Sequence, residues 1–133
     1  MEETLRVFRA SCPLSHPFLQ AAFIQKTEQQ MLERTLEEFA TDVLDEGGIR
    51  AFLCRKGDFI EALFVDPPFQ RQGLGKRLLD HLKSQTPVIR LSVFAQNPRA
   101  IRFYQREEFW AVRLAEHRET GETIVLLKWE AKR

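Results

Sequence analysis

The segment Gln70-Arg71-Gln72-Gly73-Leu74-Gly75-Lys76 constrains the fold of this chain more than any other stretch, because it joins two patterns of different period. The apolar run Phe59–Val65 before it is typical of a strand, and Pro67 ends that strand because proline cannot donate to a ladder. After the glycines, leucines recur at the spacing of an apolar helix face, at Leu74, Leu78, Leu79 and Leu82. A glycine-rich turn at a helix start presents unpaired N–H groups, which suit phosphate. The segment therefore predicts a strand, a phosphate-binding turn and a helix.

The rest of the chain alternates between strand and helix patterns. A hairpin is expected where Asp45-Glu46-Gly47-Gly48 separates two apolar runs. Asn97-Pro98 is typical of a helix start, because Asn suits the N-cap and Pro the first helical position. The strand–helix–strand segment from 59 to 94 should form a right-handed crossover with parallel strands. We expect strands at 4–9, 43–44, 49–54, 59–65, 88–94, 109–115 and 123–129, and helices within 18–39, over 73–85 and from 97.

Composition and charge narrow the class of protein. The chain has 133 residues, 44% hydrophobic and 29% charged, so we expect residues 1–133 to form a single globular domain. The formal net charge of +1 gives no overall field toward nucleic acid or a membrane surface, and no apolar run is long enough to span a bilayer. Cys12 and Cys54 lack metal-ligand spacing, so we expect free thiols in a reducing cytoplasm and no metal site.

Two familiar glycine motifs fail on spacing at the turn. A Walker A loop requires G-x-x-x-x-G-K-[ST], and here Lys76 is followed by Arg77. A Rossmann fingerprint requires G-x-G-x-x-G, and Leu78 stands where its third glycine belongs. From the turn alone, a phosphate site and an ordinary glycine-capped turn remain equal alternatives.

Two motifs in order resemble the GNAT superfamily of acetyl-CoA-dependent N-acetyltransferases. The segment 70–75 is similar to the family's Q/R-x-x-G-x-G/A motif, and the segment 97–104, Asn-Pro-Arg-Ala-Ile-Arg-Phe-Tyr, is similar to its N-x-x-A-x-x-F-Y motif. The resemblance covers about residues 40 to 129. It implies an α/β (α+β) fold, with a mixed, mostly antiparallel sheet, a central parallel strand pair and flanking helices. It also implies acetyl-CoA as co-substrate and an amine acceptor as partner, with no nucleic acid or membrane, in a monomer or homodimer.

The resemblance assigns contacts with acetyl-CoA to three segments. The diphosphate needs convergent N–H donors, which the main chain of the turn can supply. The turn residues concerned are Arg71, Gln72, Gly73, Leu74, Gly75 and Lys76. The pantetheine arm carries two amides and can bond along a strand edge, which the family places at Leu63, Phe64 and Val65. Asn97 is expected to cap its helix and also to contact the cofactor.

Tyr104, the only tyrosine in the chain, is the general acid that the resemblance implies. When an amine attacks the thioester, the CoA thiolate leaves, and a nearby phenol can protonate it. Taken without the motif, Tyr104 is more simply a core aromatic residue with a satisfied hydroxyl.

The general base stays open at this stage. Many relatives carry a glutamate on the strand where this chain has Ser92. Glu61 is the alternative carboxylate, provided that its strand is regular and places it on the face of Phe59 and Leu63. A solvated strand glutamate is an equal interpretation of Glu61. His16 is a third candidate for the base, although a lone histidine in a loop is more often a bystander.

One residue departs from the family pattern near the second motif. The family often has glycine just before the phenylalanine that follows this helix, and here Glu108 precedes Phe109. If Glu108 takes the left-handed conformation of a helix cap, it costs about 1 kcal/mol.

Function and acceptor leave alternatives open as well. The short segment from Arg9 to Pro17 and the absent strand glutamate motivate an acetyl-CoA-binding sensor or interaction module without turnover. A basic helix face formed by Arg99, Arg102 and Arg106 is the feature that a nucleic-acid- or protein-binding domain unrelated to CoA would use, although such faces are usually only solvated. The acceptor can be a protein lysine, a protein N-terminus or a small amine. A likeness of His16-Pro17-Phe18-Leu19 to small bacterial protein-lysine acetyltransferases favours lysine.

Overall fold

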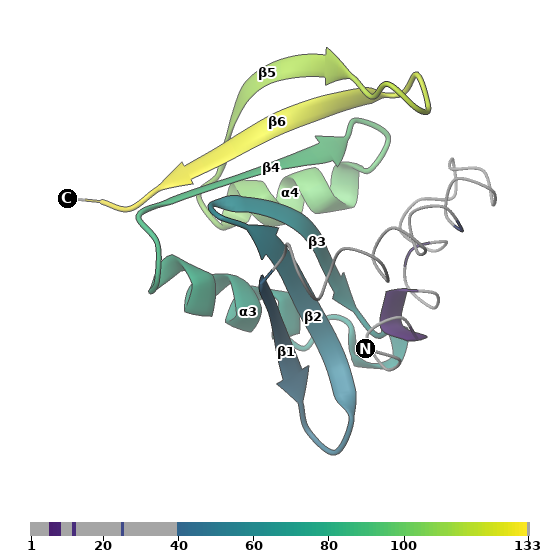
Figure 1. Ribbon diagram of the computed structural model, residues 1–133, viewed down its shortest axis with the longest axis vertical. Helices are drawn as coiled ribbons and strands as arrows, with labels where there is room; N and C mark the ends of the chain where they lie inside the picture. The colour runs from purple at the N-terminus through teal and green to yellow at the C-terminus, as the bar shows by residue number, and fades with distance from the viewer. Residues whose placement is uncertain (1–5, 9–11, 13–24, 26–39, 133) are drawn as a thin grey trace.

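The computed structural model describes residues 6–8, 12, 25 and 40–132 (Figure 1). Within residues 40–132, the strands and helices expected from the sequence are all present. The strands at 59–65 and 88–94 have the expected ends, and the ends of the other elements are shifted. None of the helices in the described ranges is long and apolar enough to cross a bilayer. The elements are β1 (Ala40–Asp45), β2 (Ile49–Lys56), β3 (Phe59–Val65), the 3-10 helix η1 (Pro67–Phe69), α3 (Leu74–Lys83), β4 (Val88–Phe94), α4 (Pro98–Arg106), β5 (Trp110–Glu116) and β6 (Thr123–Glu130).

The six strands form one sheet in the order β1-β2-β3-β4-β6-β5. Neighbouring strands are antiparallel except β3 and β4, which are parallel because the chain crosses over through α3 between them. The expected mixed, mostly antiparallel sheet with a central parallel pair and flanking helices is therefore confirmed.

The two parallel strands stay paired only where they begin. Phe59 pairs with Arg90, and the N–H of Arg90 donates to the carbonyl of Asp58 at 2.8 Å. Beyond this point β3 and β4 run apart toward their C-terminal ends (Figure 1). The other edge of β3 pairs with β2 as far as Val65, whereas the edge facing β4 has no partner beyond Phe59 among the strands of residues 40–132.

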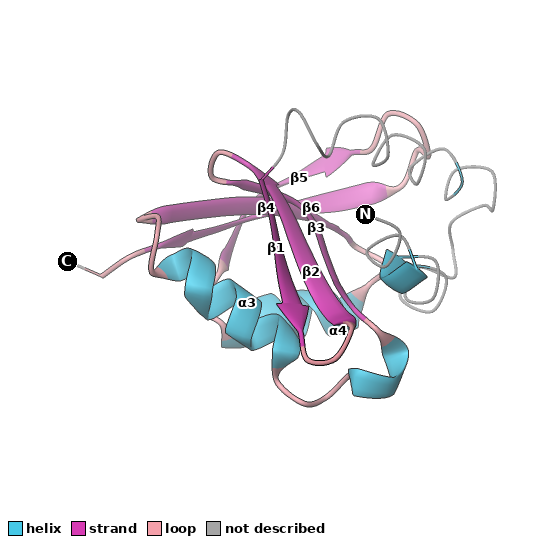
Figure 2. Cartoon of the chain, turned by 60° about the horizontal axis from the view of Figure 1, so that its bottom comes forward, coloured by secondary structure: helices cyan, strands magenta, loops and turns pink. Residues whose placement is uncertain are grey.

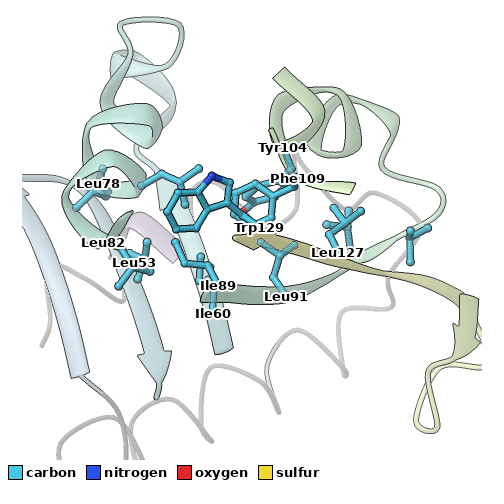
Figure 3. Packing of buried hydrophobic residues seen from close by; sticks show 14 of the residues in the cluster. Leu53, Ile60, Leu78, Leu82, Ile89, Leu91, Tyr104, Phe109, Leu127 and Trp129 are labelled. Atoms are coloured by element: carbon cyan, nitrogen blue, oxygen red, sulfur yellow. The ribbon is translucent and has the colours of Figure 1, made fainter. Parts of the chain in front are cut away.

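Helices α3 and α4 lie on the same face of the sheet (Figure 2). Leucines of α3 pack on this face against β2, β3, β4 and β6, as their helical spacing predicts (Figure 3). Trp129 of β6 and Phe109, which precedes β5, pack in the same cluster near Tyr104 of α4. The main core therefore lies between the sheet and the two helices that carry both motifs.

The opposite face of β2 packs on the described residues of the N-terminus. Phe52 and Cys54 alternate along β2 with Ala51 and Leu53 of the main core, so they point away from α3. The second cluster consists of Val7, Phe8, Cys12, Phe52 and Cys54.

The strand expected at 4–9 is wrong in its described part. Arg6, Val7 and Phe8 are helical, and so is Cys12. Neighbours in a strand point to opposite faces, whereas Val7 and Phe8 are both buried in one cluster, at 0% and 1% exposure. Six residues of alternating character were too few to separate a strand from a helical turn. The helix expected within 18–39 lies outside the described residues, apart from the helical Gln25.

Candidate active site

The turn before α3 leaves main-chain N–H groups without acceptors in the helix. Gly73, at the N-cap, has a φ of 77°, and Arg71 has a φ of 66°, so both adopt the left-handed conformation. Among the described residues, no side chain caps this helix end, and the N–H of Arg77 bonds to the carbonyl of Gly73 at 3.0 Å. The N–H groups before Arg77 therefore have no intrahelical partner, and the positive end of the helix dipole lies beside them. The groups concerned belong to Leu74, Gly75 and Lys76.

Hydrogen bonds of the residues just before the glycines hold this turn to the sheet. Asp66 is only 5% exposed, and it accepts a hydrogen bond at 2.8 Å from the guanidinium of Arg6. Its own N–H donates to the carbonyl of Arg50 at 2.7 Å. The amide of Gln70 donates to the carbonyl of Val65 at 3.2 Å. The turn is thus fixed against β2 and the end of β3 by the protein's own bonds.

A groove of about 520 Å³ opens between this turn, the end of β3 and α4. It brings together the sequence-predicted site residues except Glu61 and Gln72, which do not line it. The predicted residues that line it are Leu63, Phe64, Val65, Arg71, Gly73, Leu74, Gly75, Lys76, Asn97 and Tyr104.

Six further residues line the groove that the sequence reasoning did not assign to a site. Five of them lie on α4 or at its C-terminal end. Helical spacing from Asn97 as the N-cap could have predicted that they share one face of this helix. Gln70 belongs to the first motif and was passed over in favour of its main-chain neighbours. The six are Gln70, Arg99, Ala100, Phe103, Arg106 and Glu107.

Asn97 starts α4 as expected. Its side-chain oxygen accepts a hydrogen bond from the N–H of Ala100 at 3.3 Å, and Pro98 occupies the first turn. Asn97 is 9% exposed, so the cap is set into the groove wall rather than on the open surface.

Tyr104 is a largely buried phenol at the groove wall, with 8% of its surface exposed. Its ring makes edge contacts with Phe103 and Phe109, at centroid distances of 5.0 Å and 5.3 Å. Burial raises the pKa of Tyr104 above its usual value, because the charged phenolate would lose hydration. At neutral pH the side chain therefore keeps its proton and can act only as a donor of it.

The end of α4 fixes Tyr104 from the C-terminal side. Glu108 has a φ of 71°, which confirms the left-handed conformation considered for it from the sequence. The N–H of Phe109 bonds to the carbonyl of Tyr104 at 2.9 Å, and the N–H of Glu108 bonds to that of Gln105 at 3.1 Å. These two bonds and the ring contact between Tyr104 and Phe109 form a Schellman cap.

Glu107 links this cap to α3. Its carboxylate is mostly buried and lies 3.1 Å from the ammonium of Lys76 and 3.7 Å from that of Lys83. The ammonium of Lys83 also donates to the carbonyl of Glu107 at 2.8 Å. The ion pair satisfies a charge that would otherwise be buried alone, and it holds the groove walls together.

Glu61 lies at a bulge and is exposed. Cys54 pairs with Ala62, and Arg55 pairs with Ile60, which leaves Glu61 as the extra residue. The regular strand that would have put Glu61 on the face of Leu63 is therefore not present. Its carboxylate contributes to a raised pKa of the Cys54 thiol, whose main cause is burial.

The other candidates for the base are placed as follows. Ser92 is exposed on β4, opposite Leu126 of β6, and does not line the groove. His16 lies outside the described residues.

A turn with main-chain N–H groups at a helix start, the edge of β3 and a buried phenol line one groove, an arrangement that suits a phosphate-bearing coenzyme. Residues 8–109 match the model of the acetyltransferase (GNAT) family, and the chain belongs to this family. It is accordingly an N-acetyltransferase that uses acetyl-CoA.

Similar proteins cover nearly the whole chain. A peptidyl-lysine N-acetyltransferase, YjaB of Salmonella typhimurium, is 28% identical over 132 residues, 95% of this chain and 88% of the relative. The peptidyl-lysine N-acetyltransferase YiaC of Escherichia coli is 29% identical over 127 residues, 94% of this chain and 87% of the relative. The solution structure of apo YjaB from Escherichia coli superposes with a TM-score of 0.84 at 23% identity, covering 98% of this chain and 91% of that one.

Proposed function

We propose that the protein moves the acetyl group of acetyl-CoA directly to a primary amine, with Tyr104 as the general acid for the departing CoA thiolate. The observation that carries this proposal is the position of Tyr104. A phenol with a raised pKa lines the same groove as the phosphate-binding turn and the open edge of β3. The protonated phenol can donate a hydrogen bond or its proton to a thiolate that forms beside it.

The residues of the groove fit acetyl-CoA by their chemistry. The free N–H groups at the start of α3 suit its diphosphate. Toward its C-terminal end, the edge of β3 that faces β4 pairs with no described strand, and Leu63, Phe64 and Val65 line the groove there. The main chain of this segment can supply the alternating donors and acceptors that the two amides of pantetheine need. Asn97 caps α4 with its side-chain oxygen and lines the groove, so we assign its side chain a contact with the cofactor as well.

The turn also leaves space for a phosphate to come close to its backbone. A Cβ placed on Gly73 would meet nothing within 4 Å, so the space in front of this residue is open. A Cβ on Gly75 would instead meet the Phe103 ring at 3.5 Å, on the inner side of the helix. Gly73 therefore serves the left-handed backbone, and the groove in front of it stays clear.

We propose Glu61 as the group that receives the proton of the incoming ammonium, acting through water. It is an exposed carboxylate on β3, two residues before the edge assigned to the cofactor, and the bulge turns it out of the regular ladder. Glu61→Gln is expected to lower kcat and to shift the pH–rate profile toward higher pH, because a weaker base leaves more amine protonated. Glu116→Gln, on the distant edge strand β5, is the control. An unchanged profile for Glu61→Gln would remove Glu61 from the reaction.

The acceptor that we propose is a lysine side chain of a protein. Both relatives described above are named peptidyl-lysine N-acetyltransferases, and each covers about 95% of this chain. We also propose a cytoplasmic location, which the two free, buried cysteines support.

The test is an acceptor screen that measures the release of CoA thiol. The screen includes lysine peptides, peptides with a free N-terminus and blocked lysines, polyamines, aminoglycosides and amino acids, with mass spectrometry of each product. Lysine peptides should give saturable release and a product heavier by one acetyl group on the side-chain nitrogen. Turnover only with the N-terminal peptides or small amines would overturn the proposed acceptor. Tight binding of acetyl-CoA without turnover on any amine would point to the sensor module instead.

A further inference from the structure

Several positively charged side chains line the groove, and only some of them form ion pairs. Lys76 is engaged by Glu107 and Asp80, at 3.1 Å from each carboxylate. Among the described residues, the guanidinium groups of Arg71, Arg99 and Arg106 form no ion pair, although all three line the groove. Three cations of this kind along one groove indicate a ligand with more than one anionic group.

Two of these arginines lie on one face of α4. Arg99 and Arg106 are seven residues apart, which is two helical turns and about 10 Å along the axis. Arg102 lies between them on the same helix, is exposed and does not line the groove. The basic character of this helix is therefore divided into a groove face and a solvent face.

The C-terminal half of α4 faces the phosphate-binding turn. Gly75 lies against the Phe103 ring, and Lys76 reaches Glu107. Arg106 precedes Glu107 and follows Phe103 by three residues, so it lies beside the two residues that contact the turn, and it lines the same groove. The backbone N–H groups and Arg71 already suit the diphosphate, which carries two negative charges. The arginines of α4 remain for a second phosphate.

We propose that Arg99 and Arg106 bind the ribose 3′-phosphate of the coenzyme, with Arg106 as the stronger contact, so that the enzyme selects CoA esters over dephospho-CoA esters. This inference rests on the function proposed above and adds the side chains that bind the nucleotide part of the coenzyme. A guanidinium binds a phosphate through two parallel N–H bonds, and a phosphate monoester carries nearly two charges at neutral pH.

The test measures the affinities of CoA and dephospho-CoA by calorimetry. The proteins are the wild type, Arg99→Gln, Arg106→Gln, the double variant and the matched control Arg102→Gln. The wild type should bind CoA about tenfold or more tightly than dephospho-CoA. The affinity for CoA should fall more steeply with salt than the affinity for dephospho-CoA does. The double variant should lose the preference while its affinity for dephospho-CoA changes by less than about threefold. Arg106→Gln should account for the larger part, and Arg102→Gln should match the wild type.

Three results contradict parts of this account and can be told apart. Equal affinities of the wild type for CoA and dephospho-CoA would show that the protein does not recognise the 3′-phosphate. An equal loss for both ligands in the double variant would assign the arginines to the diphosphate instead. A wild type that binds neither ligand would overturn the proposed function together with this inference, whereas the first two results leave that function standing.

Discussion

Glu108→Gly should leave the protein as stable as the wild type or slightly more stable, although it removes a side chain. Glu108 holds a φ of 71° in the cap of α4, where a residue with a Cβ is strained by about 1 kcal/mol. Glycine relieves this strain and adds backbone entropy to the unfolded chain, which costs about 0.4–1 kcal/mol. The exposed pair between Glu108 and Lys132, at 3.4 Å, contributes almost nothing. The net gain is therefore about 0–0.6 kcal/mol.

The assay is urea unfolding followed by tryptophan fluorescence, because Trp129 is buried beside Phe109 and reports on this region. A gain of about 0.5 kcal/mol corresponds to a rise of roughly 2 °C in Tm for a chain of this size. Glu108→Ala is the matched control, since it also loses the pair with Lys132 but keeps the Cβ. We expect Glu108→Ala to be less stable than Glu108→Gly. If Glu108→Gly were clearly less stable than both the wild type and the alanine variant, the strain argument would be refuted.

Further predictions concern the turn, its anchor and the second cluster. Gly73→Ala should lose about 1 kcal/mol in the same assay because of its φ of 77°, whereas Gly75→Ala should lose nothing, since its Cβ makes only an ordinary contact with a ring. Asp66→Asn should destabilise by about 1–3 kcal/mol because it removes the charge of a buried carboxylate that accepts from Arg6, while Asp58→Asn, at an exposed pair, should stay within about 0.5 kcal/mol. Burial raises the pKa of Cys12 from 9.0 to about 11, so the stabilisation that comes from keeping this thiol neutral is complete below pH 9 and falls as the pH rises toward 11. Unfolding titrations across this pH range should show the loss. Iodoacetamide should label Cys12 of the native protein slowly at pH 8.

The parts of the fold that the sequence predicted are those set by local chemistry. Pro67 and Gly73 mark the end of β3 and the start of α3, and Asn97 with Pro98 marks the start of α4. Each of these residues acts through its own backbone or through a bond to a residue three positions away. The left-handed Glu108 could also be anticipated, because a helix cap needs that conformation whichever residue occupies it.

The features that the sequence could not predict depend on distant contacts. Val7 and Phe8 are both buried against β2, and only that packing selects a helical turn over a strand. The bulge at Glu61 follows from the register between β2 and β3, which strand alternation alone does not reveal. Likewise, Arg99 and Arg106 read as a solvated helix face until the turn before α3 is placed against α4.

The most direct test of the account is the rate of acetyl transfer by Tyr104→Phe, measured in single turnovers with a lysine peptide and saturating acetyl-CoA. Phenylalanine keeps the ring contacts with Phe103 and Phe109 and removes only the proton donor. The account predicts a rate lower by about a hundredfold or more, with the Kd for acetyl-CoA and the Tm close to those of the wild type. A rate within about threefold of the wild type at unchanged affinity would show that Tyr104 is part of the groove wall and not the acid of the reaction.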